Sequence, residues 1–582
     1  MTSISVSLAL NRLSAPALTT TENGAVAFES TSSKCLNLFF KMIRNTSKEH
    51  IEQLFYEAWL EDPKMAMQVL LQCRDCRKGK GERLIVQHAL AWLRKYKTKT
   101  YLKNLTTFLG AGYYQDLLSM VKHAEKGCQP ALGKSDMLEL ELFAEQLLND
   151  EKKLNNGESV SLAAKWAPTE CHADDRNFEL ARRLANILYS NESDINSKRM
   201  VYEPNSHLKK YRLLTSKLRK HIRVVECQMA HNQWSEINYE TVPAKSHRLH
   251  KAAFKKHDPE RYQKYIEDVL ANKKQIKSTG VQPHELVKPF MCCATPDNHE
   301  TLQAQWNDMI NQLRKTTKLS SILPLCDVSG SMEGEPMEVC VALGLLISEL
   351  VEGPFANKVM TFETSPQLMN LKEKKLGERV RELKKAPWGG STNLEAAFDQ
   401  ILNHAVMMSC TQEQLPKVLV IFSDMQFNEA TRCARMKPTS TIFELARDKF
   451  AAEGYKMPSV VFWNLRDTKE SFPVTIGEEG VALLSGYSAS LVKELMEDPE
   501  NITPLKMLNH VLDPYSSMVT VDEEDIGPID TRKNYPVHMY THKDKNLRRK
   551  PRGTGPGSAR RKRKGGGTDG SPLSLFLSCS IF

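Results

Sequence analysis

Residues 418–424 read VLVIFSD, an apolar run that passes directly into a serine and an aspartate. Five consecutive apolar residues bounded by polar ones predict a strand that is buried on both faces of a sheet. Other strand candidates recur along the chain with helical patterns between them, at 321–326, 358–362, 460–463 and 481–484. This alternation predicts a doubly wound, Rossmann-like α/β domain with a parallel sheet over residues 318–505.

The preceding residues, 34–317, have a helical pattern almost throughout. Leu54, Phe55 and Ala58 recur at helical spacing. Asp62-Pro63 predicts the start of a new helix, because aspartate caps helices and proline fits their first turn. Successive short helices predict stacked antiparallel pairs, as in HEAT-like solenoids, although the sequence has no strict repeat period. The predicted fold class is therefore α plus α/β.

Both ends of the chain differ in composition from these domains. Residues 1–33 lack periodicity, which predicts a flexible arm. Residues 506–582 form a C-terminal extension that we expect to be disordered and basic from about residue 540. Within it, residues 543–564 hold eleven Lys or Arg and one acid, which accounts for the net charge of +10. The two basic clusters predict a bipartite nuclear localisation signal, a nonspecific nucleic-acid arm or a solvated tail, and a cytoplasmic or nuclear protein.

The composition argues against the membrane and disulfide classes. No run approaches the roughly 20 apolar residues that span a bilayer, and the first residues lack the basic flank of a signal peptide. The thirteen cysteines include one CxxC pair, Cys73 and Cys76, with no second pair to complete a zinc site. We expect reduced thiols rather than disulfides or a cysteine-bound metal.

Three segments rich in small oxygen-bearing side chains follow predicted strands or precede a predicted helix. Their candidate ligands are Asp327, Ser329 and Ser331 in DVSGS, Thr392 in GGSTN and Asp424 in FSD. Ligands of doubly wound sheets bind outside the carboxyl ends of the strands, so we expect these side chains to meet there. Two carboxylates and three hydroxyls suit Mg²⁺ or Mn²⁺ better than zinc. The alternative is that each serine or aspartate only caps a helix.

The three segments together resemble the metal-ion-dependent adhesion site (MIDAS) of von Willebrand factor A-type (vWA) domains. The resemblance implies that Ser329, Ser331 and Thr392 offer hydroxyl oxygens, while Asp327 and Asp424 supply charge largely through water. It also implies that a carboxylate from an acidic protein partner completes the metal coordination.

The helical part is similar in layout to the TROVE module of Ro ribonucleoprotein autoantigens. It resembles more closely an uncharacterised plant and viral family that has the same helical module and a C-terminal vWA domain. The segments that carry this resemblance are CRKGKGER (76–83), GYYQDLL (112–118), SLAAKWAP (161–168) and the stretch 234–265. Ro-type proteins bind structured RNA and single-stranded RNA ends, so the resemblance implies an RNA partner.

A basic run at 207–223, HLKKYRLLTSKLRKHIR, offers candidates for contact with RNA phosphates. It contains no acid, and its seven cations are Lys209, Lys210, Arg212, Lys217, Arg219, Lys220 and Arg223. A second basic cluster downstream contains Lys245, Arg248, Lys251, Lys255 and Lys256. Such surfaces attract a phosphate backbone. The alternative is an ordinary solvated helix face.

These observations favour a non-enzymatic binding or scaffold protein. Haloacid-dehalogenase phosphatases need a second aspartate two residues after the first, and Ser329 stands there instead. No His or Glu lies near the three loops in a place to act as a general base. A protein-interaction adaptor without RNA binding and a metal-dependent phosphoesterase are the alternative hypotheses.

Overall fold

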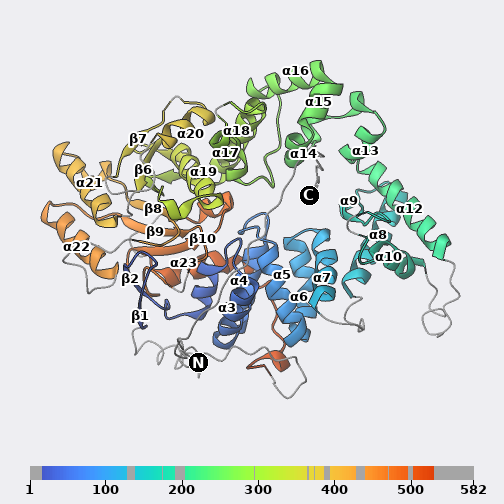
Figure 1. Cartoon of the computed structure of the whole chain (residues 1–582), viewed down its shortest axis with the longest axis horizontal. Helices are drawn as coiled ribbons and strands as arrows, with labels where there is room; N and C mark the ends of the chain where they lie inside the picture. The colour runs from blue at the N-terminus through green and yellow to red at the C-terminus, as the bar shows by residue number, and fades with distance from the viewer. Residues whose placement is uncertain are drawn as a thin grey trace, which may run out of the picture. The chain divides into compact units, whose positions relative to one another are not determined.

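The N-terminal part of the molecule is a succession of helices (Figure 1). The predicted boundary at Asp62-Pro63 is confirmed: the Met65 amide donates a hydrogen bond to the Asp62 carboxylate at 2.9 Å, and Pro63 begins the next helix. Leu54, Phe55 and Ala58 are buried on one face, as their spacing predicted. The helices are α2 (Lys34–Lys41), α3 (Lys48–Glu61), α4 (Pro63–Arg74), α5 (Leu84–Tyr96), α6 (Thr98–Ala111), α7 (Tyr114–Gly127), α8 (Leu138–Asn155), α9 (Ala163–Trp166), α10 (Leu180–Tyr189), α12 (Pro204–His221), α13 (Val225–Ala230), α14 (Ala244–Leu249), α15 (Lys251–His257), α16 (Pro259–Leu270), α17 (Pro283–Cys292) and α18 (His299–Thr316).

This computed structural model leaves several segments of the chain undescribed. It describes residues 16–127, 138–172, 175–189, 204–293, 295–362, 366–372, 374–385, 393–427, 439–468, 471–495 and 502–529. The basic tail with its predicted localisation signal lies outside these ranges, as does Thr392. Within them, no helix is both long and apolar enough to cross a membrane.

A six-stranded sheet lies at the centre of the C-terminal part, with the strand order β10-β9-β8-β4-β6-β7. Its strands are β4 (Ile322–Asp327), β6 (Lys358–Phe362), β7 (Leu368–Asn370), β8 (Val418–Ser423), β9 (Ser459–Asn464) and β10 (Val481–Ser485). All residues of β4, β8 and β10 are buried, as the continuous apolar runs predicted. The connecting helices are α19 (Glu335–Leu350), α20 (Leu376–Lys384), α21 (Leu394–Met407) and α22 (Thr439–Ala452).

One edge of the sheet corrects the prediction of an all-parallel arrangement. Strand β7 pairs antiparallel with β6, with Lys358 opposite Asn370. Only residues 363–367 connect the two strands. A parallel crossover needs a dozen or more residues, so a connection this short returns the chain in the opposite direction.

The strand order creates a topological switch point between β4 and β8. Numbered along the chain from β4, the strands have the order 3-2-1-4-5-6, with the first and fourth side by side. Cys326 pairs with Phe422 in the parallel register, so both strands end at the same level. Connections leave these two strands in opposite directions, which opens a crevice beyond their carboxyl ends.

The predicted flexible arm over residues 1–33 is wrong for its second half. Strands β1 (Leu18–Thr20) and β2 (Val26–Phe28) form an antiparallel hairpin. Gly24 permits the turn with a φ of 89°, a conformation that favours glycine. Phe28 also pairs with Phe472, and these long-range contacts carry no local sequence signal.

The predicted boundary at residue 505 cuts through helix α23 (Pro504–Leu512). This helix packs against β10 and α4, so it connects the sheet to the helical part. The following residues lie along α6: the Thr100 amide donates to Asp525 at 2.6 Å, and the Asn104 amide group donates to the Thr520 carbonyl at 2.6 Å. The first part of the C-terminal extension is therefore ordered against the helices.

Candidate functional site

The two predicted aspartates lie at the switch point of the sheet. Asp327 is the last residue of β4, and Asp424 directly follows β8. Both side chains are buried, at 0% and 1% exposure. Two carboxylates out of water and near one another repel, so this arrangement calls for a compensating cation.

Asp327 is held by hydrogen bonds on both carboxylate oxygens. The Ser423 hydroxyl donates to Oδ2 at 2.5 Å, and the Ser329 amide donates to Oδ1 at 2.9 Å. Burial raises the pKa of Asp327 to about 6; the hydrogen bond from Ser423 opposes this shift, and the charge of Asp424 adds to it. These two hydrogen bonds fix the orientation of the Asp327 carboxylate.

Asp424 has one carboxylate oxygen without a hydrogen bond of normal geometry. Its Oδ1 accepts from the Gln426 amide at 3.1 Å, whereas Oδ2 is buried and has no such partner among the described residues. Burial raises the pKa of Asp424, and the Ser331 hydroxyl opposes the shift. The nearest cation is Arg466, whose Nη1 lies 4.0 Å from Oδ2. A buried carboxylate oxygen that accepts no hydrogen bond is a feature expected of a ligand position.

The hydroxyls of Ser329 and Ser331 lie beside these carboxylates, with their Oγ atoms 3.1 Å apart. Four of the five predicted ligands therefore come from one sheet edge, while Thr392 falls outside the described residues. These hard oxygen donors fit Mg²⁺ or Mn²⁺. Among all described residues, those of this site included, no group of three or more His, Cys, Asp or Glu could hold a metal ion, and the site offers two carboxylates with serine hydroxyls instead.

Two residues of this site were missed in the sequence. Ser423 stands in the FSD motif and positions Asp327. Arg466 follows β9 and donates a hydrogen bond to the Ser331 carbonyl. The position of Arg466 just beyond the carboxyl end of a buried strand was a signal that could have found it.

Six of the seven predicted phosphate-binding cations lie on α12, and Arg223 follows two residues after its end. Leu208, Tyr211, Leu214 and Leu218 form the buried face of this helix. Six cations are exposed, whereas Arg219 is half-buried and donates to the Ala164 carbonyl at 2.8 Å. Arg219 therefore stabilises the fold through backbone contacts, which could not be predicted from the basic run alone.

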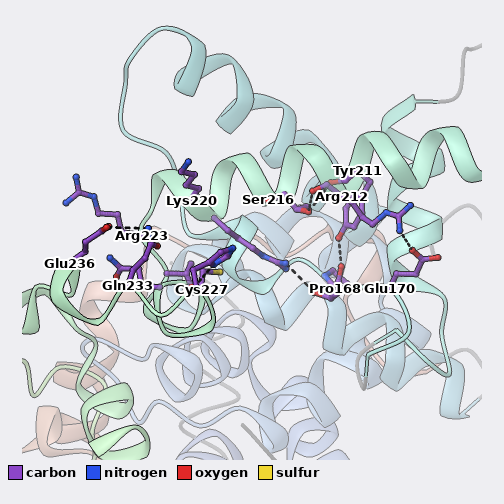
Figure 2. Close-up of a pocket in the computed structure, with 16 residues that line it drawn as sticks. Pro168, Glu170, Tyr211, Arg212, Ser216, Lys220, Arg223, Cys227, Gln233 and Glu236 are labelled. Atoms are coloured by element: carbon purple, nitrogen blue, oxygen red, sulfur yellow. Dashed lines mark hydrogen bonds and ion pairs between the residues drawn. The ribbon is translucent and has the colours of Figure 1, made fainter. Parts of the chain in front are cut away.

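A cavity of about 760 Å³ lies beside the second half of α12 (Figure 2). Arg212, Arg219, Lys220 and Arg223 line it together with Glu170 and Glu236. Figure 2 shows Arg212 directed at Glu170, where the ion pair measures 3.5 Å, and Tyr211 donating to the Pro168 carbonyl at 2.8 Å. The cavity is lined by more basic than acidic side chains, but Arg212 and Arg219 already have partners within the protein.

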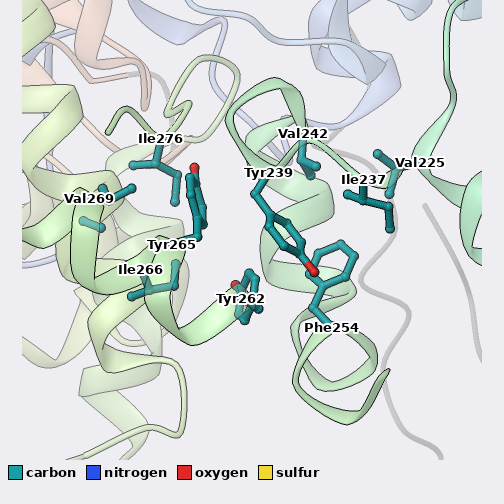
Figure 3. Packing of buried hydrophobic residues seen from close by; sticks show 11 residues of the cluster. Val225, Ile237, Tyr239, Val242, Phe254, Tyr262, Tyr265, Ile266, Val269 and Ile276 are labelled. Carbon is teal, nitrogen blue, oxygen red and sulfur yellow. The ribbon is translucent and has the colours of Figure 1, made fainter. Parts of the chain in front are cut away.

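Lys245, Arg248 and Lys251 of the second basic cluster have partners within the fold, whereas Lys255 and Lys256 are exposed. Arg248 forms an ion pair with Glu285, and Lys251 donates to the Asp297 carbonyl. Figure 3 shows the aromatic core that this region builds, in which Tyr239 stacks on Tyr265 at 5.5 Å between ring centroids. Part of the stretch 234–265 therefore serves packing, because Tyr239, Phe254, Tyr262 and Tyr265 are buried in this core.

Family models cover nearly the whole described chain. A model named domain of unknown function DUF2828 matches residues 21–141 and 137–319, and one named DUF7788 matches residues 321–534. The chain belongs to the DUF2828 family. The boundary between the two matched models coincides with the start of β4 and so with the junction of the helical and sheet parts.

One curated relative of this DUF2828 protein is "Uncharacterized protein L728" of Acanthamoeba polyphaga mimivirus. It is 32% identical over 548 residues, covering 89% of this chain and 92% of the relative. Among solved structures, the Ro (RSR) protein of Deinococcus radiodurans has a TM-score of 0.41 and 13% identity, covering 83% of this chain and 100% of that one. This is a distant similarity in arrangement.

Proposed function

We propose that this protein is a non-enzymatic binding protein whose α/β part is a vWA-type domain that presents a divalent cation to a carboxylate of a partner protein. The observation that carries the proposal is the buried Oδ2 of Asp424, which has no hydrogen bond of normal geometry among the described residues. Ser329 and Ser331 would offer hydroxyl oxygens to Mg²⁺ or Mn²⁺, with Asp327 and Asp424 supplying charge. The resemblance to the adhesion site places Thr392 in the same set.

A calorimetric titration with Mn²⁺ or Mg²⁺ tests this proposal. Asp424→Asn keeps the shape of the side chain but removes its charge, and should abolish measurable binding. Asp448→Asn is the matched control, because Asp448 is an exposed residue of α22. Equal titration heats for wild type and Asp424→Asn would refute the site. Turnover in a phosphoesterase screen of the metal-loaded protein would instead favour the enzymatic alternative.

A second candidate function, RNA binding by the helical part, is supported by the outer face of α12. The side chains of Lys209, Lys220 and Arg223 are exposed and have no hydrogen bond or ion pair with a described residue. Exposed cations on α12 and just after its end suit contact with phosphates.

A salt-titrated RNA-binding assay separates this function from that of an adaptor without RNA. The double variant Lys209→Glu with Lys220→Glu should weaken binding and reduce its salt dependence. Lys64→Glu reverses an exposed charge elsewhere on the helices and is the control. Absence of salt-dependent affinity in the wild type would leave the adaptor hypothesis.

A further inference from the structure

The residues after β9 connect the candidate metal site to the helical part. The Leu465 amide donates to the Ser423 carbonyl at 3.0 Å, and the Thr468 hydroxyl donates to the Asp424 carbonyl at 3.3 Å. On the other side, His50 of α3 lies 3.0 Å from the Asp467 carboxylate. Residues 465–468 thus contact both the end of β8 and helix α3, and Arg466 lies within this anchored segment.

The guanidinium of Arg466 is both close to the site and open to solvent. It donates to the Ser331 carbonyl, and its Nη1 lies 4.0 Å from Oδ2 of Asp424. The side chain is 49% exposed, and Nε and Nη2 have no hydrogen bond with a described residue. Arg466 therefore places a positive charge at the rim of the site without filling it.

The formal charges at the site explain what this arginine would do. Asp327 and Asp424 contribute two negative charges, and Arg466 reduces their sum to one. A divalent cation would leave the assembly with one positive charge, which a carboxylate from outside would neutralise. Without Arg466, the two aspartates alone would balance the cation. Glu22, exposed on the turn between β1 and β2, exerts only a weak repulsion on Asp424, which is screened by solvent.

We propose that Arg466 makes the cation and the partner carboxylate bind cooperatively, so that the site is completed by an anion. The inference rests on the proposed metal-binding function. Arg466 opposes the cation by charge repulsion and attracts the incoming carboxylate with its open donors. Binding of one ligand then raises the affinity for the other by the same factor.

Mn²⁺ titrations monitored by electron paramagnetic resonance test the coupling, with acetate as the carboxylate probe and chloride as the reference at constant ionic strength. In the wild type, acetate should raise Mn²⁺ affinity roughly 5- to 20-fold, in the lower part of the range of about 5- to 150-fold that is typical of such coupling. Arg466→Gln should bind Mn²⁺ about tenfold more tightly in chloride and lose most of the acetate effect, because the repulsive charge is gone. Arg466→Lys retains the charge and should behave like the wild type.

Arg447→Gln is the matched control, since Arg447 donates to the Glu479 carbonyl away from the site. Its Mn²⁺ affinity and acetate effect should be those of the wild type. An Arg466→Gln protein that binds Mn²⁺ no more tightly than the wild type, or that keeps the full acetate effect, would overturn the inference while leaving the metal site intact. Failure of both proteins to bind Mn²⁺ would overturn the proposed function as well.

Discussion

The Nζ atom of Lys80 lies 2.7 Å from the hydroxyl of Ser485, a residue 405 positions later in the chain. Lys80 is completely buried, and it also donates to the carbonyls of Phe39 and Met42. Lys80, the second lysine of the KGKGER segment, thus connects the end of α2 to the carboxyl end of β10. All three of its donors are satisfied, which is how a buried ammonium is tolerated.

Lys80→Met should destabilise the protein by about 2–4 kcal/mol, because it removes three buried hydrogen bonds, although the Ser485 hydroxyl still donates to the Phe39 carbonyl. The measurement is the shift of the urea unfolding midpoint. Lys78→Met, two residues away and exposed, should leave the midpoint within error. Equal midpoints for the two variants would mean that the hydrogen bonds of Lys80 do not stabilise the fold.

Gly486→Ala should disturb the same contact. Gly486 has a φ of 111°, and a Cβ atom there would lie 3.2 Å from Cγ of Lys80. Gly454 also has a positive φ, of 77°, but a Cβ there meets nothing within 4 Å. Both alanine variants carry the backbone penalty of about 1 kcal/mol. Only Gly486→Ala should lower the melting temperature by substantially more than this penalty implies. A smaller decrease for Gly486→Ala than for Gly454→Ala would contradict the close contact between Gly486 and Lys80.

Acid should destabilise the fold through His284. Burial and the nearby Arg44 lower the pKa of His284 to about 4, from an ordinary value of 6.5. Between these values the unfolded chain binds more protons than the folded one, so stability falls as the pH drops from about 6.5 to 4. The loss should approach about 3 kcal/mol. His284→Gln should flatten this part of the stability profile, whereas the exposed His231→Gln should not, as pH-dependent urea unfolding would reveal.

Arg219 and Lys220 should differ in function although they are neighbours in one basic run. Arg219→Ala removes bonds to the Ala164 and Ala167 carbonyls and should reduce stability by about 1–3 kcal/mol. Lys220→Ala should leave stability unchanged and weaken RNA binding if that function is correct. Unfolding and RNA-binding curves on both variants check the division, and a reversed pattern would contradict it.

Thr21→Val should loosen the loop that follows Asp424. The Thr21 hydroxyl donates to the Phe427 carbonyl at 2.8 Å, and Asn23 donates to the Gln426 carbonyl at 2.7 Å. Loss of one buried hydrogen bond should increase amide exchange at residues 425–427 by about fivefold, equivalent to roughly 1 kcal/mol. Thr411→Val, in an exposed turn, is the control. Unchanged exchange would show that the hairpin does not hold this loop.

Elements with local signals could be predicted from the amino-acid sequence alone. Continuous apolar runs predicted β4, β6, β8, β9 and β10, because strands buried on both faces need apolar side chains at every position. Asp62-Pro63 predicted a helix start, because capping depends on adjacent residues. The order of DVSGS and FSD after such strands also predicted that Asp327 and Asp424 lie at one edge of the sheet.

Features that depend on partners distant in the chain could not be predicted in this way. Nothing local distinguishes Arg219, which donates to backbone carbonyls, from Lys220, which is open to solvent. The hairpin at 18–28 is stable because it docks on Phe427 and Phe472. The lack of a hydrogen bond at Oδ2 of Asp424 and the approach of Arg466 to 4.0 Å are likewise properties of packing. The burial of a strand follows from its own residues, whereas the partner of a charge is set by the tertiary fold.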